Sequence, residues 1–220
     1  MSILCLVTDR RRLSGAYGPT EVERLVCQVE VAAEAGVDLV QVRERDLDGG
    51  PLAELVSRCL AVVGPSSTRL LVNERVDVAI ACGAHGVHLR SDSMTASRVR
   101  AIAPPSFTIG RSVHSVGEAA GQTEAGGLDY LLLGAIFPPS GKPPGPGPLG
   151  TAALAEACRQ TAVPVLAIGG VDFSRLPAIA RIGAAGFAAI GLFADAAGPR
   201  ALAETVRQAR KVFDMPPAPP

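Results

Sequence analysis

Eight short apolar runs recur along the chain, and each is followed by a loop and a segment with helical spacing. The runs lie at residues 3–9, 38–45, 69–74, 86–90, 107–114, 130–137, 164–170 and 186–193. Segments such as residues 21–36 and 150–161 repeat apolar side chains every three or four positions, as amphipathic helices do. Strands that alternate with helices form parallel sheets. We therefore predict an α/β fold, a single-domain (β/α)8 TIM barrel over residues 1–214.

A doubly wound open sheet is the alternative fold. Such sheets usually have fewer strands and often carry a glycine-rich turn after the first strand. Here the first run ends in Thr8, Asp9 and Arg10, without that turn. The chain of 220 residues suits a compact barrel near the lower size limit.

Two segments are predicted to be irregular because they are rich in proline and glycine. Residues 138–150 read PPSGKPPGPGPLG, and neither a helix nor a strand tolerates so many prolines and glycines. This loop follows the sixth predicted strand, on the barrel face where active sites are built. Residues 215–220 form a proline-rich C-terminal tail that we expect to fray.

Charge and hydropathy exclude several classes of partner. The 21 basic and 21 acidic residues balance to a net charge of zero, whereas nucleic-acid binding needs a basic surplus. We interpret Arg10, Arg11 and Arg12 as a solvated loop. No apolar segment approaches the roughly 18 residues of a membrane span. We therefore expect small-molecule partners, with neither nucleic acid nor membrane among them.

The N-terminus and the cysteines indicate an intracellular protein. The first residues, MSILCLVTD, lack the basic region and cleavage site of a signal peptide. The five cysteines lie far apart, form no CxxC pair and cannot all pair within one chain. Reduced thiols in a cytoplasmic protein are the simplest interpretation.

Polar side chains interrupt the second predicted strand near its end. Because side chains alternate along a strand, Gln41, Arg43 and Arg45 share one face. A buried cation without a partner is costly, and guanidinium groups match phosphate oxygens in a bidentate geometry. We therefore predict a phosphate or pyrophosphate site here. The alternative is an internal ion-pair network with Glu44 or Asp46.

Glycines follow the seventh and eighth predicted strands. Gly169 and Gly170 end one strand, and Ile190 and Gly191 end the next. Glycines at these two strand ends let backbone N–H groups converge on a phosphate, as is usual in such barrels. Tight turns without a ligand are the alternative interpretation.

The fifth predicted strand carries one of only three histidines. His114 shares a face with Ser112 near the strand end, so it is a candidate acid or base. Arg111 then points toward the helices, and we assign it a structural role. We interpret His88 as a hydrogen-bonded structural residue and His85 as a surface turn residue.

Taken together, these motifs resemble the thiamine-phosphate synthase/TenI family. The matching segments run in order through nearly the whole chain: QVRER (41–45), LVNERVDVAIACGAHGVHL (71–89), GRSVHS (110–115), LDYLLLGAIFP (128–138), Lys142, PVLAIGG (164–170) and GFAAIGLF (186–193). The resemblance implies a TIM barrel, a place in thiamine biosynthesis and a thiazole phosphate ligand.

The family divides into two activities. Synthases join a thiazole phosphate to a pyrimidine pyrophosphate with magnesium, whereas TenI-type tautomerases shift a proton on a thiazole carboxylate phosphate without metal. Synthases carry QLREK, ND, HLGQxD and FPTxTK, followed by a serine in the eighth strand. This chain departs from that pattern at Arg45, Glu74, Arg90–Ser91, Pro139–Gly141 and Gly191. The departures fall mainly on pyrophosphate, metal and thiazole-carboxylate contacts, which favours a TenI-like thiazole tautomerase.

The tautomerase hypothesis makes His114 the proton carrier, because an imidazole can take and give a proton near neutral pH. The phosphate would lie at Gly169, Gly170, Ile190 and Gly191. The remaining substrate contacts would come from Gln41, Arg43, Arg45, Asn73, Ser112 and Lys142. This hypothesis needs neither metal nor cofactor.

Two other hypotheses remain open. In a synthase, Glu74 and Asp92 would hold Mg²⁺, while Gln41, Arg43, Arg45 and Lys142 would bind pyrophosphate. His114 would then only line the site. A non-catalytic barrel that senses thiazole phosphates is the third hypothesis. The sequence leaves the oligomeric state open, a homo-oligomer included.

Overall fold

Eight parallel strands close into a barrel in the computed structural model, which describes residues 2–138 and 147–214. The strands are β1 (Ile3–Val7), β2 (Leu39–Val42), β3 (Arg69–Asn73), β4 (Gly86–Leu89), β5 (Thr108–Val113), β6 (Tyr130–Gly134), β7 (Val165–Ile168) and β8 (Gly186–Ala189). Each strand pairs with the next, and Ile3 of β1 lies opposite Gly186 of β8. The predicted (β/α)8 barrel is therefore confirmed, and the open sheet is excluded.

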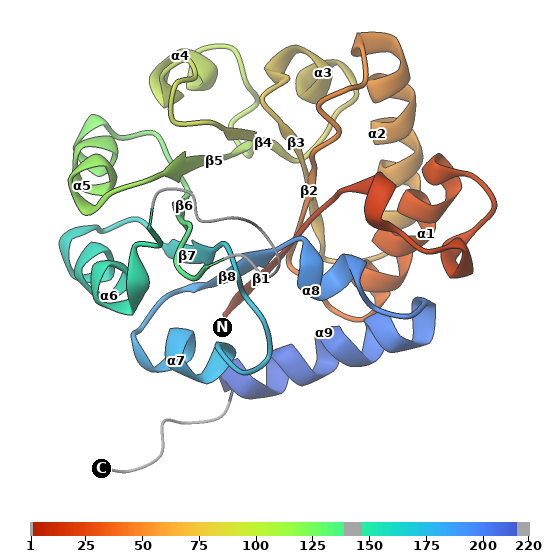
Figure 1. Ribbon diagram of the computed structural model, residues 1–220. Helices are drawn as coiled ribbons and strands as arrows, with labels where there is room; N and C mark the ends of the chain where they lie inside the picture. The colour runs from red at the N-terminus through yellow and green to blue at the C-terminus, as the bar shows by residue number, and fades with distance from the viewer. Residues whose placement is uncertain (1, 139–146, 215–220) are drawn as a thin grey trace.

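Helices surround the strands on the outside of the barrel (Figure 1). They are α1 (Glu21–Glu34), α2 (Gly49–Val63), α3 (Val76–Ala81), α4 (Ala96–Arg100), α5 (Val116–Ala125), α6 (Gly150–Gln160), α7 (Leu176–Arg181), α8 (Gly191–Ala194) and α9 (Pro199–Asp214). Two short 3-10 helices, η1 (Arg10–Arg12) and η2 (Gly15–Tyr17), follow β1. Among the described residues, no helix is long and apolar enough to cross a bilayer.

The helix predicted over residues 21–36 begins where its sequence carries a capping box. Thr20 Oγ accepts the backbone N–H of Glu23 at 3.2 Å, and the Glu23 carboxylate accepts the Thr20 N–H at 3.1 Å. The pair satisfies two of the N–H groups that a helix start leaves without partners. Leu25 and Val29 then face the core and are fully buried.

Most of the observed strands end earlier than the apolar runs that predict them. The run at 38–45 becomes a strand only to Val42, and the run at 164–170 ends as a strand at Ile168. Parallel pairing stops there, and the following residues turn over the barrel mouth. Of the polar residues predicted near strand ends, Arg43, Arg45 and His114 therefore lie in the loops just beyond. Gln41, Asn73 and Ser112 remain within their strands.

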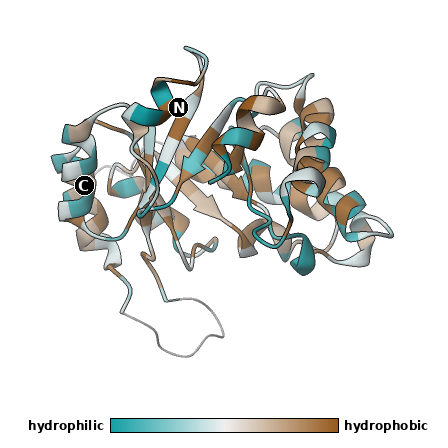
Figure 2. Ribbon diagram, turned by 90° about the horizontal axis from the view of Figure 1, so that it is seen from above, coloured by the Kyte–Doolittle hydropathy of each residue, from teal (hydrophilic) through white to brown (hydrophobic). Residues whose placement is uncertain are grey.

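Apolar side chains form two layers, one inside the barrel and one between strands and helices. The inner layer contains Cys5, Val7, Leu39, Leu71, Tyr130, Leu132, Leu166 and Ala188. The outer layer joins the other strand faces to the helices. Figure 2 shows the strands as largely hydrophobic and the helices as alternating hydrophobic and hydrophilic bands. Burial of both strand faces explains why the runs are nearly continuous in apolar residues.

A glycine inside the barrel makes room for a tyrosine on the next strand. Gly110 of β5 lies opposite Tyr130 of β6. A Cβ atom at Gly110 would lie 2.1 Å from Cζ of Tyr130, which is closer than atoms can pack. The absence of a side chain at Gly110 therefore lets the Tyr130 ring fill the barrel interior.

One arginine of α9 ties the C-terminal helix to the strand ends opposite the mouth. The Arg210 guanidinium donates to the Ser2 carbonyl at 2.6 Å, to the Gly36 carbonyl at 2.6 Å and to the Asp38 carboxylate at 2.6 Å. Asp38 also accepts the Leu4 N–H at 2.7 Å. The same carboxylate thus links β1 and α9.

Part of the predicted irregular sequence lies outside the described residues. This applies to residues 139–146, which include Lys142, and to the predicted tail at 215–220. Gly150, which the predicted loop at 138–150 and the predicted helix at 150–161 share, begins α6.

Candidate active site

The mouth of the barrel encloses a cavity of about 630 Å³ at the C-terminal ends of the strands. One side is built by β2 to β5 and the residues that follow them, and the other by β6 to β8. Val7, Leu132 and Ile168 contribute apolar side chains between these two sides. A concave site with apolar walls and a few polar groups is the usual form of a small-molecule site.

Two arginines follow β2 and line the cavity. Arg43 is half-buried and Arg45 is exposed, while Gln41 is buried below them. Among the described residues, no carboxylate oxygen lies within 4.0 Å of either guanidinium. Burial and the neighbouring charge of Arg45, the two largest causes, lower the pKa of Arg43, while the carboxylates of Asp9 and Glu44 oppose this shift to a smaller extent. Both causes penalise the cation, so an anion in the cavity stabilises this pair.

The carboxylates that alternate with these arginines bind elsewhere. Glu44 and Asp46 both pair with Arg10, which lies after β1 and is only 7% exposed. The alternative in which Glu44 or Asp46 neutralises Arg43 and Arg45 is therefore wrong. The prediction of a solvated loop at residues 10–12 is also wrong for Arg10, although Arg11 and Arg12 are exposed.

Buried polar side chains form the floor of the cavity. His88 of β4 is 2% exposed, with Nδ1 2.9 Å from the Tyr130 hydroxyl and Nε2 2.9 Å from the Ser112 hydroxyl. Burial, reinforced by the charges of Arg111 and Arg43, lowers the pKa of His88 from 6.5 to about 3. The imidazole is therefore neutral, and each hydroxyl matches one ring nitrogen. This agrees with the structural interpretation of His88, which nevertheless contacts the cavity.

His114 lies one residue beyond β5, on the cavity and exposed to solvent. Its Nδ1 is 2.7 Å from the carbonyl oxygen of Gly134, which can only accept, so Nδ1 carries the hydrogen. The neutral ring then presents Nε2 as its acceptor. The backbone N–H of His114 donates to the Glu118 carboxylate at 2.8 Å. These contacts fix the ring at the edge of the mouth.

The two predicted metal ligands line two neighbouring hollows. Asp92 lines the main cavity and pairs with Arg90 at 2.5 Å. Glu74 has a left-handed backbone (φ 66°) and lines a neighbouring hollow of about 290 Å³. Its carboxylate accepts the Arg90 N–H at 2.5 Å and the Ser93 hydroxyl at 2.6 Å. Within residues 2–138 and 147–214, no group of three or more metal-ligating side chains forms.

Arg111 lies under the loop that follows β4, and its guanidinium binds backbone carbonyls of that loop. Arg111 is buried and donates to the carbonyls of Arg90 at 2.9 Å and of Ser91 at 3.1 Å, and also to that of Met94. It thereby supports the loop after β4, as a structural role requires.

His85, predicted to be at a surface turn, is half-buried, and its Nδ1 accepts the Leu70 N–H at 3.0 Å.

A glycine turn and the apolar residues Ile168 and Ile190 form the side of the cavity built by β7 and β8. Gly169 and Gly170 follow β7 with φ of 93° and 63°, values that favour glycine. Gly169 and Ile190 line the cavity, while Gly191 begins the four-residue helix α8. The close packing at Gly170, where Arg175 binds the carbonyl and stacks on Phe137, fixes this turn.

Most of the predicted site residues come together on the one cavity. Those that line it are Gln41, Arg43, Arg45, Asn73, Asp92, Ser112, His114, Gly169 and Ile190. Glu74, Gly170 and Gly191 lie next to it, and Lys142 lies outside the described residues. Sequence reasoning missed the contributions of Arg90 and Ser91. Their position directly after the fourth strand was the available signal.

Known proteins resemble this chain over most of its length. The family model TMP-TENI, described as thiamine monophosphate synthase, matches residues 4–193. A putative thiamine-phosphate synthase of Geobacter sulfurreducens is 36% identical over 197 residues, which are 90% of this chain and 89% of the relative. A thiamine-phosphate synthase of Anaeromyxobacter dehalogenans is 36% identical over 200 residues, covering 91% and 89%.

A solved structure is similar as well. The thiamine phosphate pyrophosphorylase from Pyrococcus furiosus superposes with a TM-score of 0.80 at 27% sequence identity. The match covers 96% of this chain and 95% of that protein.

Proposed function

This chain belongs to the TMP-TENI family of thiamine biosynthesis enzymes, and from that premise we propose that it is a thiamine-phosphate synthase. The observation that carries the proposal is the pair Arg43 and Arg45, which share the cavity with the glycine turn at Gly169. One cavity thus offers two separate places for anions. A synthase needs both, one for a pyrophosphate and one for a phosphate.

The β2 side is the proposed pyrophosphate site. Arg43 and Arg45 carry two positive charges that no described carboxylate neutralises. Guanidinium groups bind phosphate oxygens through paired charge-assisted hydrogen bonds. Two such groups exceed what the single carboxylate of a tautomerase substrate requires. The charge on this side therefore favours the synthase over the tautomerase predicted from the sequence, as do the names of the relatives.

The β7–β8 side is the proposed thiazole phosphate site. Gly169 and Ile190 line the cavity there, and none of the described residues that line this side carries a charge. Backbone N–H groups at such turns bind phosphate without charged side chains. Apolar Leu132 and Ile168 between the two sites suit the flat faces of the two rings.

The proposed reaction joins the two rings in the centre of the cavity. The thiazole nitrogen forms a bond to the methylene carbon of the pyrimidine while the bond from that carbon to pyrophosphate oxygen breaks. The leaving group takes the electron pair of the broken bond, and Arg43 and Arg45 stabilise its added charge. The neutral His88, with Ser112, provides a polar floor without a competing cation.

Magnesium fits this site through one carboxylate. Asp92 lies on the cavity, where its carboxylate pairs with the exposed Arg90 side chain, whereas Glu74 accepts the Arg90 N–H and the Ser93 hydroxyl in the neighbouring hollow. Mg²⁺ is commonly held by one or two carboxylates together with substrate phosphates. Asp92 would hold it with pyrophosphate oxygens, and when bound it neutralises charge on the leaving group. Glu74 instead fixes the loop that carries Asp92.

A thiazole tautomerase is the second candidate, and His114 is the observation that favours it. The ring lines the cavity with its orientation set by the Gly134 carbonyl, so Nε2 is available as a base. In that reaction the ring nitrogen of His114 takes a proton from C2 of the thiazole. The exocyclic carbon then receives a proton, which leaves an aromatic ring.

One assay with two substrate sets separates these activities. The purified protein receives either thiazole phosphate, pyrimidine pyrophosphate and Mg²⁺, or the thiazole carboxylate tautomer with a chelator. We expect thiamine phosphate in the first mixture, lost in Arg43→Ala and retained in His114→Asn. Turnover only in the second mixture, abolished by His114→Asn, would overturn the proposal in favour of the tautomerase. Binding without turnover in either mixture would indicate the non-catalytic barrel.

A further inference from the structure

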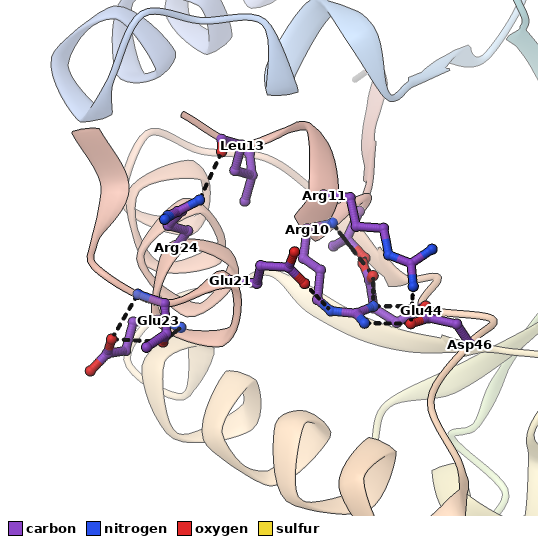
Figure 3. Close-up of polar contacts among 10 residues, drawn as sticks. Arg10, Arg11, Leu13, Glu21, Glu23, Arg24, Glu44 and Asp46 are labelled. Atoms are coloured by element: carbon purple, nitrogen blue, oxygen red, sulfur yellow. Dashed lines mark hydrogen bonds and ion pairs between the residues drawn. The ribbon is translucent and has the colours of Figure 1, made fainter. Parts of the chain in front are cut away.

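Arginines and acids alternate after β2 in the order Arg43, Glu44, Arg45, Asp46. Adjacent opposite charges on a flexible loop tend to neutralise each other. Here they separate, because the two arginines line the cavity while the two carboxylates bind Arg10 (Figure 3). Some part of the structure must hold the acids away from the cavity.

Arg10 is the residue on which the acids converge. Its Nη1 donates to Glu44 Oε2 at 2.8 Å and to Asp46 Oδ1 at 2.8 Å, and its Nη2 donates to Asp46 Oδ2. Its Nε lies 3.1 Å from Glu21 at the start of α1. The side chains of Arg10 and Glu44 are only 8% and 3% exposed. A buried pair with one partner removed leaves an uncompensated charge, so each partner fixes the other.

The same network also fixes the backbone at the cavity. Thr8 donates its hydroxyl to Glu44 Oε1 at 2.6 Å and accepts the backbone N–H of Arg43 at 2.9 Å. The backbone N–H of Arg10 donates to Glu44 at 3.2 Å. Glu44 is thus joined to β1 from two directions, and the residue before it is held in place.

We propose that Arg10 is a positioning residue for anion binding, which sequesters the Glu44 and Asp46 carboxylates so that Arg43 and Arg45 meet the anion without a competing acid. The inference rests on the proposed function, since it assigns a supporting residue to the same anion site. Arg10 itself does not line the cavity.

The electrostatics of the cluster agree with this role. The hydrogen bonds from Arg10 hold the pKa of Asp46 well below its usual range. Asp46 therefore stays ionised, and without Arg10 its carboxylate would keep only the exposed Arg11 as a partner. Glu44 would likewise become a buried carboxylate that lacks its main cation and competes for Arg43.

Binding of inorganic pyrophosphate, measured by isothermal titration calorimetry on the full chain, tests the inference. We expect Arg10→Ala to weaken binding by at least tenfold. Arg11→Ala is the matched control, because Arg11 contacts the same Asp46 carboxylate from solvent, 62% exposed, at 2.8 Å. It should change the dissociation constant by less than twofold. In turnover, Arg10→Ala should raise KM for the pyrimidine pyrophosphate and leave KM for the thiazole phosphate unchanged.

A rescue variant tests whether Arg10 acts by sequestering the two carboxylates or only by supporting the loop after β2. Arg10→Ala combined with Glu44→Gln and Asp46→Asn removes both competing charges while keeping similar shapes. We expect it to recover pyrophosphate binding to within threefold of the original protein. A triple variant that folds but binds pyrophosphate as weakly as Arg10→Ala does would overturn the inference. If Arg10→Ala fails to fold, Arg10→Lys, whose single ammonium cannot hold both acids, takes its place with the same expectations.

Other outcomes distinguish this inference from the proposed function. If the Arg10→Ala variant folds and binds pyrophosphate as tightly as the original protein does, the inference is overturned but the proposed function is not. Absence of pyrophosphate binding by the original protein, with or without Mg²⁺, would overturn both the anion site and the role of Arg10.

Discussion

The β2–β4 side of the cavity presents charged side chains, whereas the β7–β8 side presents a glycine turn and apolar residues. Arg43, Arg45 and Arg90 provide the charges on the first side, and Gly169 with the turn around it shapes the second. A side-chain site depends on which charges are present and where their counter-ions lie. A backbone site depends on conformation, so substitutions there act through strain and shape. The two sides should therefore respond to different kinds of substitution.

We expect the largest effect on anion binding from a substitution on the β2–β4 side of the cavity. Arg43→Ala removes a half-buried guanidinium from the proposed pyrophosphate site. Loss of a charge-assisted contact costs on the order of 3 kcal/mol, or roughly a hundredfold in affinity. Calorimetry with pyrophosphate should show this loss, with thiazole phosphate binding unchanged. An equal loss for both ligands would mean that the two halves do not bind separately.

The backbone half should respond to an added methyl group. Gly170→Ala would place Cβ 2.6 Å from the Pro138 carbonyl oxygen at a φ of 63°. We expect a loss of about 2–3 kcal/mol in the free energy of unfolding and weaker thiazole phosphate binding. Denaturant unfolding measures the first quantity. Gly183→Ala is the control, since it has a φ of 85° but open space, and it should lose only about 1 kcal/mol.

The neutral His88, below the charged β2–β4 side of the cavity, makes the free energy of unfolding depend on pH. His88 has a pKa of about 3 when folded and about 6.5 when unfolded, so the unfolded chain binds the extra proton. This contribution is fully present above pH 6.5 and declines as the pH falls toward 3. Unfolding free energy should drop by about 2 kcal/mol between pH 7.5 and 5. His88→Asn should flatten that slope more than His85→Asn, and an unchanged slope would contradict the assignment.

The smallest effect is expected from an exposed ion pair beside the backbone half. Arg12 and Asp195 lie 2.7 Å apart with side chains 44% and 61% exposed. Exposed pairs contribute less than about 1 kcal/mol, so Arg12→Ala should change the unfolding free energy by under about 0.5 kcal/mol. Phosphate binding should also be unchanged. A clear loss of phosphate binding would mean that charged side chains contribute to anion binding on the β7–β8 side as well.

The alternation of strands and helices was sufficient to predict the barrel, because periodicity is a local property. Strand ends were less predictable, since residues 43–45 of the predicted run at 38–45 lie beyond Val42, where β2 ends, although Glu44 is still buried. A run of apolar residues indicates burial, and burial continues where strand pairing has stopped. The positions just beyond that end include Arg43 and Arg45, which line the cavity.

The partners of the charged residues could not be predicted from the sequence. Arg10 and Glu44 are 34 residues apart, and the parallel pairing of β1 with β2 brings them together to form the buried pair. Adjacent residues such as Glu44 and Arg45 suggested the wrong pairing. The partners of Glu74 were equally hidden, because its carboxylate accepts from Arg90 and Ser93, which lie 16 and 19 residues away.

Closure of β8 onto β1 also sets the order in which this protein completes its fold during synthesis. Ile3 pairs with Gly186, so one edge of the first strand waits for a partner made more than 180 residues later. At ribosomal rates of about 5–20 residues per second, that wait is roughly 10–40 s. An open strand edge is a template for unwanted pairing during this interval. Arg210, which joins Ser2, Gly36 and Asp38, is translated later still, so the nascent chain gains these contacts last.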